Sequence, residues 1–394
     1  MRTRQVIRCA LLTSVLMFIL GVALLMTLNT VPTESYLLHH KPGTQIIKKS
    51  RNFPQGGEDV KMDQPWELSK PKVIRDIKFF DRSTEKYLVS NFSYSKGIGN
   101  LMFQYASLRS LAERRQSTLV VPITTTLRRA FVLNATFVSK KVADELLRRA
   151  ANSTFDIKNC CQYVATPESS TDERLTAVTG YLQNPRYFMP DNEELIRKEF
   201  DFLPDIQEQA LSFLRALAAR RALEKARPLY FDGKPSDNAF EMETDILLDD
   251  LYYIGVHVRR GMDIAMNSRN LRHGHEAAPA EYYRRAMEMA SKGKTNVIFV
   301  VCSDNPAWAK RNLPAYDKGM IFACPGVYRE VDMAILLNCD ALVLSTGTFS
   351  WWSGFLNIKS EQTIYYDGWP RPGSDLMKMV NKTELYPKSW IPLL

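Results

Sequence analysis

Residues 254–263 read Ile-Gly-Val-His-Val-Arg-Arg-Gly-Met-Asp and join an apolar run to a histidine, two arginines and an acid. Alternating hydrophobicity from Tyr253 to Arg260 predicts a buried strand that delivers His257, Arg259 and Arg260 at its carboxyl end. Ligands of open α/β sheets bind at that end of the strands. An arginine guanidinium keeps its charge and offers a rigid fork of donors that suits phosphate oxygens. The segment predicts a phosphate or pyrophosphate site, the alternative being a strand that ends in a solvated charge cluster.

Two further segments place polar groups where a predicted strand ends. Asp304 follows a strand at 296–301, and its carboxylate suits the donor edge of a base or a ribose hydroxyl. Ser345, Thr346, Gly347 and Thr348 join a strand at 341–344 to a helix, whose first backbone N–H groups can hold an anion. With the arginines, these segments predict a pocket for a nucleoside diphosphate. The alternatives are that Asp304 and the serine-threonine segment only cap helices.

Acidic metal-binding patterns are missing from the chain. It contains no Asp-x-Asp triplet, the usual sequence signal for a divalent metal that holds a nucleotide-sugar pyrophosphate. Arginine then has to neutralise a departing diphosphate. His273 and His275 form a His-x-His pair, but no third histidine or carboxylate cluster accompanies them, so we expect no metal site there. At least one of Trp351 and Trp352 is expected to pack in the core rather than to stack on a sugar.

The final third of the chain alternates strands and helices, which is typical of a parallel, doubly wound sheet. The expected strands are 252–258, 296–301, 320–323, 341–344 and 363–366, and the expected helices are 279–291, 306–313, 330–338 and 348–357. For the preceding part, the sequence pattern predicts a strand at 87–92, a tight turn at 97–100, a helix at 101–115, a strand at 119–122, and helices at 191–203 and 206–226. A Pro/Asp/Gly-rich stretch at 228–238 predicts the connection between two domains.

The N-terminus has the pattern of a membrane anchor. Residues 9–28 carry no charge and are long enough for a helix to cross a bilayer. Arg2, Arg4 and Arg8 precede them, which predicts a cytoplasmic tail at 1–8 and a lumenal or extracellular remainder. Residues 29–85 are proline-rich and lack periodicity, so we expect a stem. A cleaved signal peptide is the alternative.

Charge and glycosylation signals agree with that topology. The net charge of +9 comes largely from tail and stem, since residues 76–394 carry 41 basic and 38 acidic side chains. No basic run or basic-aromatic stripe indicates a nucleic-acid partner. Sequons for N-glycosylation occur at four positions, Asn91, Asn134, Asn152 and Asn381.

Five cysteines follow the apolar segment, and a lumenal compartment permits disulfides between them. The odd number leaves at least one thiol free or paired between chains. Cys160 and Cys161 are adjacent, and we expect them to pair elsewhere more easily than with each other. Spacing alone does not settle the pairing of Cys302, Cys324 and Cys339.

Four segments together resemble the shared motifs of the galactoside α1,2-fucosyltransferases. In chain order they are residues 97–106 (GIGNLMFQYA), 255–261 (GVHVRRG), 299–304 (FVVCSD) and 345–352 (STGTFSWW). The His-x-Arg-Arg pattern alone recurs in other fucosyltransferase families, whereas all four motifs in order are specific. The resemblance covers residues 86–394.

The resemblance implies a single-pass type II Golgi membrane enzyme with a GT-B-like α/β fold, in which two Rossmann-like domains, 86–240 and 241–394, face a cleft. It implies inverting transfer of L-fucose from GDP-β-L-fucose to the 2-hydroxyl of a galactose-terminated glycan on a glycoprotein or glycolipid, without an essential metal. By the same resemblance Arg259 and Arg260 contact the diphosphate, His257 and Asp304 the guanosine, and Ser345, Thr346, Gly347 and Thr348 the phosphates. Gly97, Gly99 and Asn100 line the cleft from the first domain.

The sequence departs from that family at one position near the arginines. The family commonly has an aspartate directly after the glycine that follows Arg-Arg, whereas here Met262 intervenes before Asp263. Asp263 stands as a candidate general base, and the departure bears on that role. Two alternatives to a galactoside fucosyltransferase are a protein O-fucosyltransferase and a catalytically inactive glycan- or nucleotide-binding relative.

Overall fold

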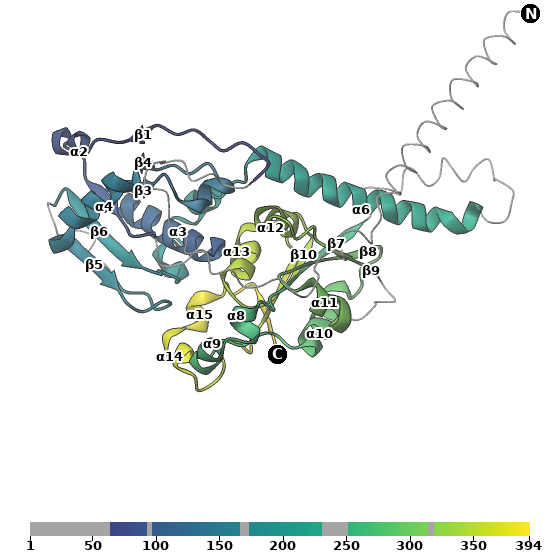
Figure 1. Cartoon of the computed structure of the whole chain (residues 1–394). Coiled ribbons are helices and arrows are strands. Elements are labelled where there is room, and N and C mark those ends of the chain that lie inside the picture. Colours follow the sequence, from purple (N-terminus) through teal and green to yellow (C-terminus); the bar gives the residue numbers. More distant parts are fainter. Residues whose placement is uncertain (1–63, 93–96, 166–172, 231–250, 314–318) are drawn as a thin grey trace, which may run out of the picture. The chain divides into compact units, whose positions relative to one another are not determined.

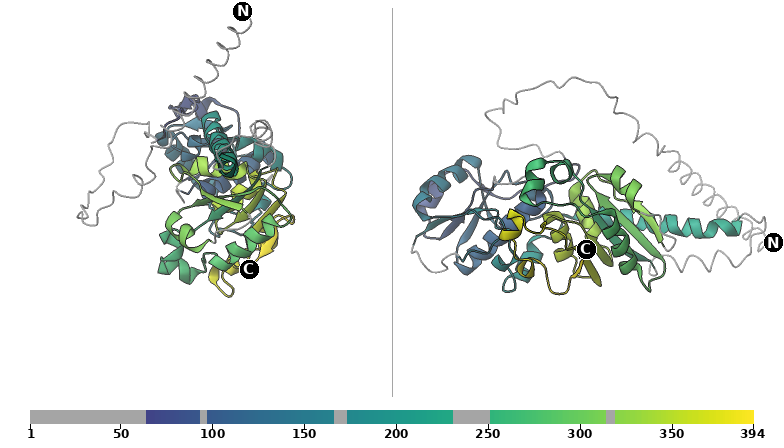
Figure 2. Two further views of the ribbon diagram at one scale, coloured as in Figure 1. Left: turned by 90° about the vertical axis from the view of Figure 1, so that its right-hand side faces the viewer. Right: turned by 90° about the horizontal axis from the view of Figure 1, so that it is seen from below.

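The computed structural model describes residues 64–92, 97–165, 173–230, 251–313 and 319–394. The expected cytoplasmic tail, the apolar segment 9–28, most of the stem and the connection at 228–238, apart from its first three residues, lie outside these ranges. Among the helices that the structure describes, none combines the length and the apolar character that a membrane span requires. The described residues form two α/β halves. In Figure 2 the first half is coloured purple to teal and the second green to yellow.

The first half is built on a sheet in which every strand pairs in parallel with its neighbours. Its strands are, in spatial order, β1 (Val73–Ile74), β4 (Thr136–Val138), β3 (Thr118–Pro122), β2 (Tyr87–Val89), β6 (Leu175–Gly180) and β5 (Thr154–Ile157). Its helices are α2 (Lys78–Arg82), α3 (Ile98–Arg114), α4 (Lys140–Arg149), α5 (Glu193–Glu199) and α6 (Pro204–Tyr230).

The second sheet is also wholly parallel, and its strand order has a functional meaning. Its strands are, in spatial order, β12 (Ile391–Leu393), β11 (Gln362–Tyr366), β10 (Ala341–Leu344), β7 (Tyr252–Val258), β8 (Val297–Ser303) and β9 (Gly319–Ala323). Counted from β7, this order is 3-2-1-4-5-6, as in nucleotide-binding Rossmann folds. The chain reverses its direction of winding between β7 and β10, and ligands bind at such a switch point.

The helices of the second half cover both faces of this sheet. They are α8 (Met262–Ala265), α9 (Ser268–His273), α10 (Ala280–Ser291), α11 (Pro306–Asn312), α12 (Arg329–Leu337), α13 (Thr348–Leu356), α14 (Asp375–Met379) and α15 (Lys382–Leu385). Alternate residues of β7 face opposite layers: Ile254 and Val256 pack with α10, while Gly255 lies against α12. The α/β class and the parallel sheets expected from the sequence are confirmed.

One hydrophobic cluster runs through both halves. Phe103 of α3 contacts Trp351 and Trp352 of α13, with ring centroids 4.6 and 5.0 Å apart. Helix α6 packs against α12, so the long helix of the first half also touches the second (Figure 1). Trp351 and Trp352 are both buried, which confirms the core role expected for at least one of them.

Three expectations about local structure are wrong. Residues 64–85 are not stem, because Trp66 and Phe80 are buried and β1 joins the first sheet. Residues 97–100 are not a tight turn but the start of α3, since packing against α13 outweighs the poor helix propensity of Gly99.

The third wrong expectation concerns the cysteines. Cys160 and Cys161 form a disulfide with each other, and contacts from far along the chain hold their backbone: the Cys160 carbonyl accepts the Gln183 N–H and the Cys161 carbonyl accepts the Asn184 side chain. Cys302 pairs with Cys324 across the ends of β8 and β9, and Cys339 is a buried free thiol.

Candidate active site

A cavity of about 1080 Å³ lies where the carboxyl ends of β7, β8 and β10 meet the start of α3. Most of the residues singled out in the sequence line it, namely Gly97, Gly99, Asn100, His257, Arg259, Asp263, Asp304, Thr346, Gly347 and Thr348. The cavity is large enough for a nucleotide sugar together with part of a second substrate. It contains the switch point of the second sheet.

Arg259 is the arginine that faces this cavity. Its guanidinium forms ion pairs with Asp304 and with Asp263, the latter at 2.5 Å between Nη2 and Oδ2. The two carboxylates hold the planar group in one orientation while its side chain stays 29% exposed. A fixed guanidinium at the mouth of a strand is suited to binding a diphosphate.

Arg260 points elsewhere and does not line the cavity. Its guanidinium lies 4.0 Å from the ring centroid of Trp308 and donates from Nη2 to the Ala278 carbonyl oxygen at 2.5 Å. Of the two arginines expected to contact a diphosphate, Arg259 alone lines this cavity. Successive side chains at the end of an extended strand point to opposite faces, which separates the two arginines.

Asp304 orders the loop that carries Arg259. Its carboxylate accepts the backbone N–H groups of Arg260, at 2.6 Å, and Gly261, at 2.9 Å, besides pairing with Arg259. A Cβ on Gly261 would lie 2.7 Å from Asp304 Oδ2, so a larger residue there would displace this carboxylate. The cap of α11 comes from Asn305 instead, whose side chain accepts the Trp308 N–H. From its place directly after β8, Asp304 thus positions the loop that carries Arg259.

The insertion of Met262 does not separate Asp263 from the site. Met262 is 75% exposed and begins the short helix α8. One residue further on, Asp263 still reaches Arg259 and lines the cavity. The structure absorbs the extra residue at the surface.

His257 lines the cavity, although its side chain is almost wholly buried. Its Nδ1 and the Ser350 hydroxyl are 2.5 Å apart, and its ring lies against Phe349 at 4.7 Å between centroids. The pKa of His257 is lowered to about 4, mainly because burial disfavours the charged imidazolium. The imidazole is therefore neutral at physiological pH.

The segment after β10 brings several polar groups to the cavity. Ser345 accepts the backbone N–H of Arg259 at 3.1 Å and the Tyr283 hydroxyl at 3.0 Å, so it braces the arginine loop. Thr346 is 1% exposed, lines the cavity, and its Oγ1 has no hydrogen-bond partner within the described part of the chain. Gly347 has φ of 94°, a conformation that favours glycine, and directs α13 toward the cavity.

The starts of α3 and α13 touch each other beside Arg259. A Cβ on Gly99 would lie 2.6 Å from the Thr348 carbonyl carbon, so only glycine allows this approach. The Thr348 hydroxyl donates to Asn100 Oδ1 at 2.7 Å, and the Trp352 indole N–H donates to the Gly99 carbonyl at 3.0 Å. Two helix N-termini and one guanidinium therefore converge on the same space, an arrangement that attracts an anion.

Two acids at the start of α12 were missed by the sequence reasoning. Asp332 lines the cavity next to Cys302, and burial raises its pKa to about 6. Glu330 is 1% exposed and pairs at 3.0 Å with Arg129 of the first half. Two acids in the first turn of a helix whose remaining residues after Arg329 are apolar (REVDMAILL) were the signal that could have revealed them.

One group in the described residues has metal-ligand composition. It consists of Cys302, Cys324 and Asp332, with candidate ligand atoms within 4.8 Å of one another. The two sulfurs are bonded to each other, whereas metals bind the thiolate form, so this group does not fit a metal ion.

The second half of the chain matches a family of known enzymes. Residues 237–393 match the model of glycosyl transferase family 11. The fucosyltransferase NodZ from Bradyrhizobium superposes with a TM-score of 0.41 at 15% identity, over 72% of this chain and 96% of NodZ. The protein is a glycosyltransferase, a class defined here by the family match.

Two curated relatives show which glycosyltransferases the chain is similar to. The galactoside alpha-(1,2)-fucosyltransferase 1 of Saimiri boliviensis boliviensis is 25% identical over 300 residues, which cover 74% of this chain and 71% of that protein. The galactoside alpha-(1,2)-fucosyltransferase 2 of Sus scrofa is 24% identical over 298 residues, covering 75% and 76%. The resemblance carried by the four motifs is confirmed, and the chain is a relative of the galactoside α1,2-fucosyltransferases.

The depressed pKa of His257 predicts a pH dependence of stability. The unfolded chain binds a proton near pH 6.5 and the folded protein only near pH 4, so the unfolded state holds more protons between these values. The free energy of unfolding should therefore fall as the pH falls from 6.5 toward 4, by about 3 kcal/mol for this one group. Urea unfolding of the wild type and of His257→Asn, which cannot titrate, measures the effect. Equal slopes against pH in both proteins would contradict the assignment.

Proposed function

We propose that this protein transfers L-fucose from GDP-β-L-fucose to the 2-hydroxyl of a galactoside and inverts the anomeric centre. The names of the relatives supply the sugar and the linkage. The observation that carries the proposal is the convergence of Arg259 and the N-termini of α3 and α13 at the switch point of a Rossmann-like sheet. A nucleoside diphosphate is the ligand that such a site accommodates best.

The chemistry follows from where charge develops. As the bond to fucose C1 breaks, the sugar gains oxocarbenium character and the departing GDP gains negative charge. Arg259 is already oriented by Asp263 and Asp304, so it can stabilise that charge without reorganising. Thr346 and the α13 N-terminus add neutral donors on the same side. In this proposal these groups do the work that a divalent metal does in other glycosyltransferases.

The remaining cavity groups fit the nucleoside. Asp332 is a buried acceptor whose neighbours include the Gly326 backbone N–H, at 3.1 Å from Oδ1. A carboxylate in that position suits the N–H edge of guanine. Neutral His257 supports Phe349 and the α13 start from behind. Asp263 faces the cavity with its side chain 55% exposed, on the side where an acceptor hydroxyl can enter.

The test of the reaction is an assay of the purified protein with GDP-fucose and a panel of acceptors. We expect fucose on galactosides, with an α1,2 linkage in the product and equal rates with and without a chelator. Transfer only to serine or threonine of a folded protein domain would favour the protein O-fucosyltransferase. Donor binding without transfer or hydrolysis would favour the inactive relative, and a chelator-sensitive rate would contradict metal independence.

The two arginines provide a matched pair of variants. Arg259→Ala should lower kcat by roughly 100- to 1000-fold, because it removes a charge aimed at the leaving diphosphate. Arg260→Ala should keep kcat within about tenfold and lower the free energy of unfolding by about 1 to 2 kcal/mol, because its guanidinium packs on Trp308. Initial rates and urea unfolding of both variants measure the contrast. A larger loss of kcat in Arg260→Ala would overturn the assignment of the facing arginine.

We propose further that the enzyme is a Golgi membrane protein with its catalytic part in the lumen. The apolar segment at 9–28 and the preceding arginines support this topology. Asn134, Asn152 and Asn381 are exposed and thus accessible to glycosylation. Removal of N-glycans with a glycosidase should increase the mobility of the cell-expressed protein, and replacing the three asparagines with glutamine should abolish most of that shift. An unglycosylated protein that fractionates with the cytosol would refute the topology.

A further inference from the structure

Part of the cavity is apolar and is not used by the groups that face the donor. It is lined by the Cys160–Cys161 disulfide together with Trp369, Leu376 and Val380, which we name the apolar wall. Cys161, Leu376 and Val380 form a separate small hydrophobic cluster, against which Cys160 and Trp369 pack. None of the wall's members carries a charge. The wall therefore offers no cation to a diphosphate, whereas its apolar surface suits an uncharged substrate.

The apolar wall is connected to the reaction centre through α9. Asn270 donates from its side chain to the Asp263 carbonyl at 2.8 Å, which ties α9 to the loop of Arg259. At the other end of α9, Arg371 donates its N–H to the Gly274 carbonyl at 3.0 Å, and the His275 ring lies 6.3 Å from that of Trp369. The wall and Arg259 thus line one continuous cavity.

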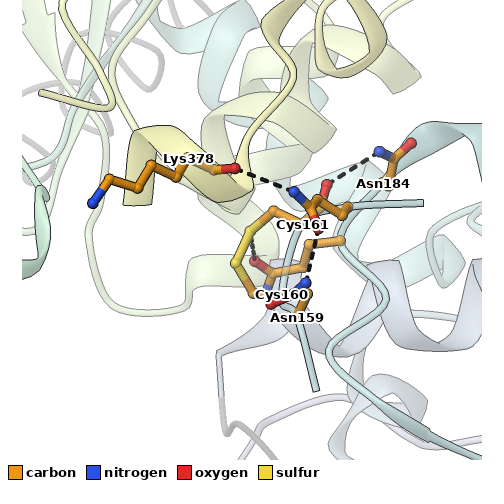
Figure 3. The surroundings of a disulfide bond; sticks show 7 residues. Asn159, Cys160, Cys161, Asn184 and Lys378 are labelled. Atoms are coloured by element: carbon orange, nitrogen blue, oxygen red, sulfur yellow. Dashed lines mark hydrogen bonds between the residues drawn. A yellow bond between two sulfur atoms is a disulfide. The ribbon is translucent and has the colours of Figure 1, made fainter. Parts of the chain in front are cut away.

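Hydrogen bonds from both halves of the protein hold the segment that carries the disulfide (Figure 3). The Cys160 carbonyl accepts the Gln183 N–H at 2.8 Å, and the Cys161 carbonyl accepts the Asn184 side chain at 3.1 Å. From the second half, the Lys378 carbonyl accepts the Gln162 side chain at 3.1 Å. A surface fixed in this way loses little conformational entropy when a ligand binds to it.

The chemistry of this surface suits a pyranose ring. A disulfide has no S–H donor, and its sulfurs are polarisable and apolar. Polar side chains surround the wall, with Tyr181 and Gln183 from the first half and Asn270 and His273 from the second. Galactose has one face of C–H groups and a rim of hydroxyls. An apolar platform with a few polar groups at its edge recognises that combination.

We propose that the Cys160–Cys161 disulfide is the platform on which the galactose ring of the acceptor packs its C–H face. This inference rests on the proposed function, which makes a galactoside the acceptor. Gln183 is the edge residue that contacts the sugar hydroxyls, since it lines the cavity, its backbone N–H is bound to the Cys160 carbonyl, and its Oε1 lies 3.9 Å from Cys161 Sγ. The disulfide is thus a specificity-determining element of the acceptor site.

The first experiment compares steady-state kinetics of the full chain and of Cys160→Ser/Cys161→Ser. The variant should raise the KM for a galactoside acceptor at least about tenfold, because it removes an apolar contact from the binding pocket. The KM for GDP-fucose and the rate of GDP-fucose hydrolysis without acceptor should stay unchanged. Cys339→Ser is the matched control, since Cys339 is buried outside the cavity and any loss there reports stability alone. An unchanged acceptor KM, or an equal rise of both KM values, overturns the proposal.

A second measurement does not depend on turnover or on the folding of the double variant. In saturation-transfer NMR with methyl β-galactoside, the ring protons on the C–H face should receive the strongest transfer from the protein. Gln183→Ala, which leaves the backbone bond to Cys160, should weaken this binding several-fold. If the wild type binds the probe in this way but transfers no fucose, the proposed reaction fails and the platform stands. No face preference in the transfer, or two free thiols at Cys160 and Cys161 in a peptide digest of the native protein, refutes the platform.

Discussion

The close approach of α3 to α13 at Gly99 is the constraint on which the rest of the site depends. Because Gly99 has no Cβ, the first turn of α3 reaches the backbone of Thr348, and the Trp352 indole can donate to the Gly99 carbonyl. This contact joins the two α/β halves through one continuous core. It also places two helix N-termini on the same side of one cavity, which neither half could do alone.

Around that contact the protein divides its polar groups between binding and support. Arg259 faces the cavity, while the side chains of Asp304 and Ser345 fix its loop by accepting backbone N–H groups. Arg260 is also an arginine, but its guanidinium packs on the Trp308 ring and donates to the Ala278 carbonyl, which stabilises the loop. A charged group that must stabilise a transient anion has to be fixed before the anion forms, and these supporting contacts fix it.

The acceptor side is built by different chemistry. The donor side gathers an arginine and helix N-termini, whereas the apolar wall is made of sulfur and hydrocarbon. Gln183, in the segment after β6, binds the Cys160 carbonyl, and Lys378 of α14 binds the side chain of Gln162. Both halves of the protein therefore position the wall. Such a division suits two substrates of opposite character, an anionic nucleotide sugar and a neutral glycan.

Much of this protein was determined by sequence-local physics. Apolar runs predicted β7 to β11 and the helices α10 to α13 to within a residue or two, because buried parallel strands and helix starts follow short-range rules, whereas the short elements α8, α9, α14, α15 and β12 were not predicted. The four motifs identified the family and many, but not all, of the cavity-lining residues. Only the tertiary structure decided which arginine faces the cavity, that Asp304 binds the Arg259 loop, that Asp332 lines the cavity, and that Cys160 pairs with Cys161. These features depend on side-chain directions and on contacts between residues far apart in the chain, which spacing along the sequence does not encode.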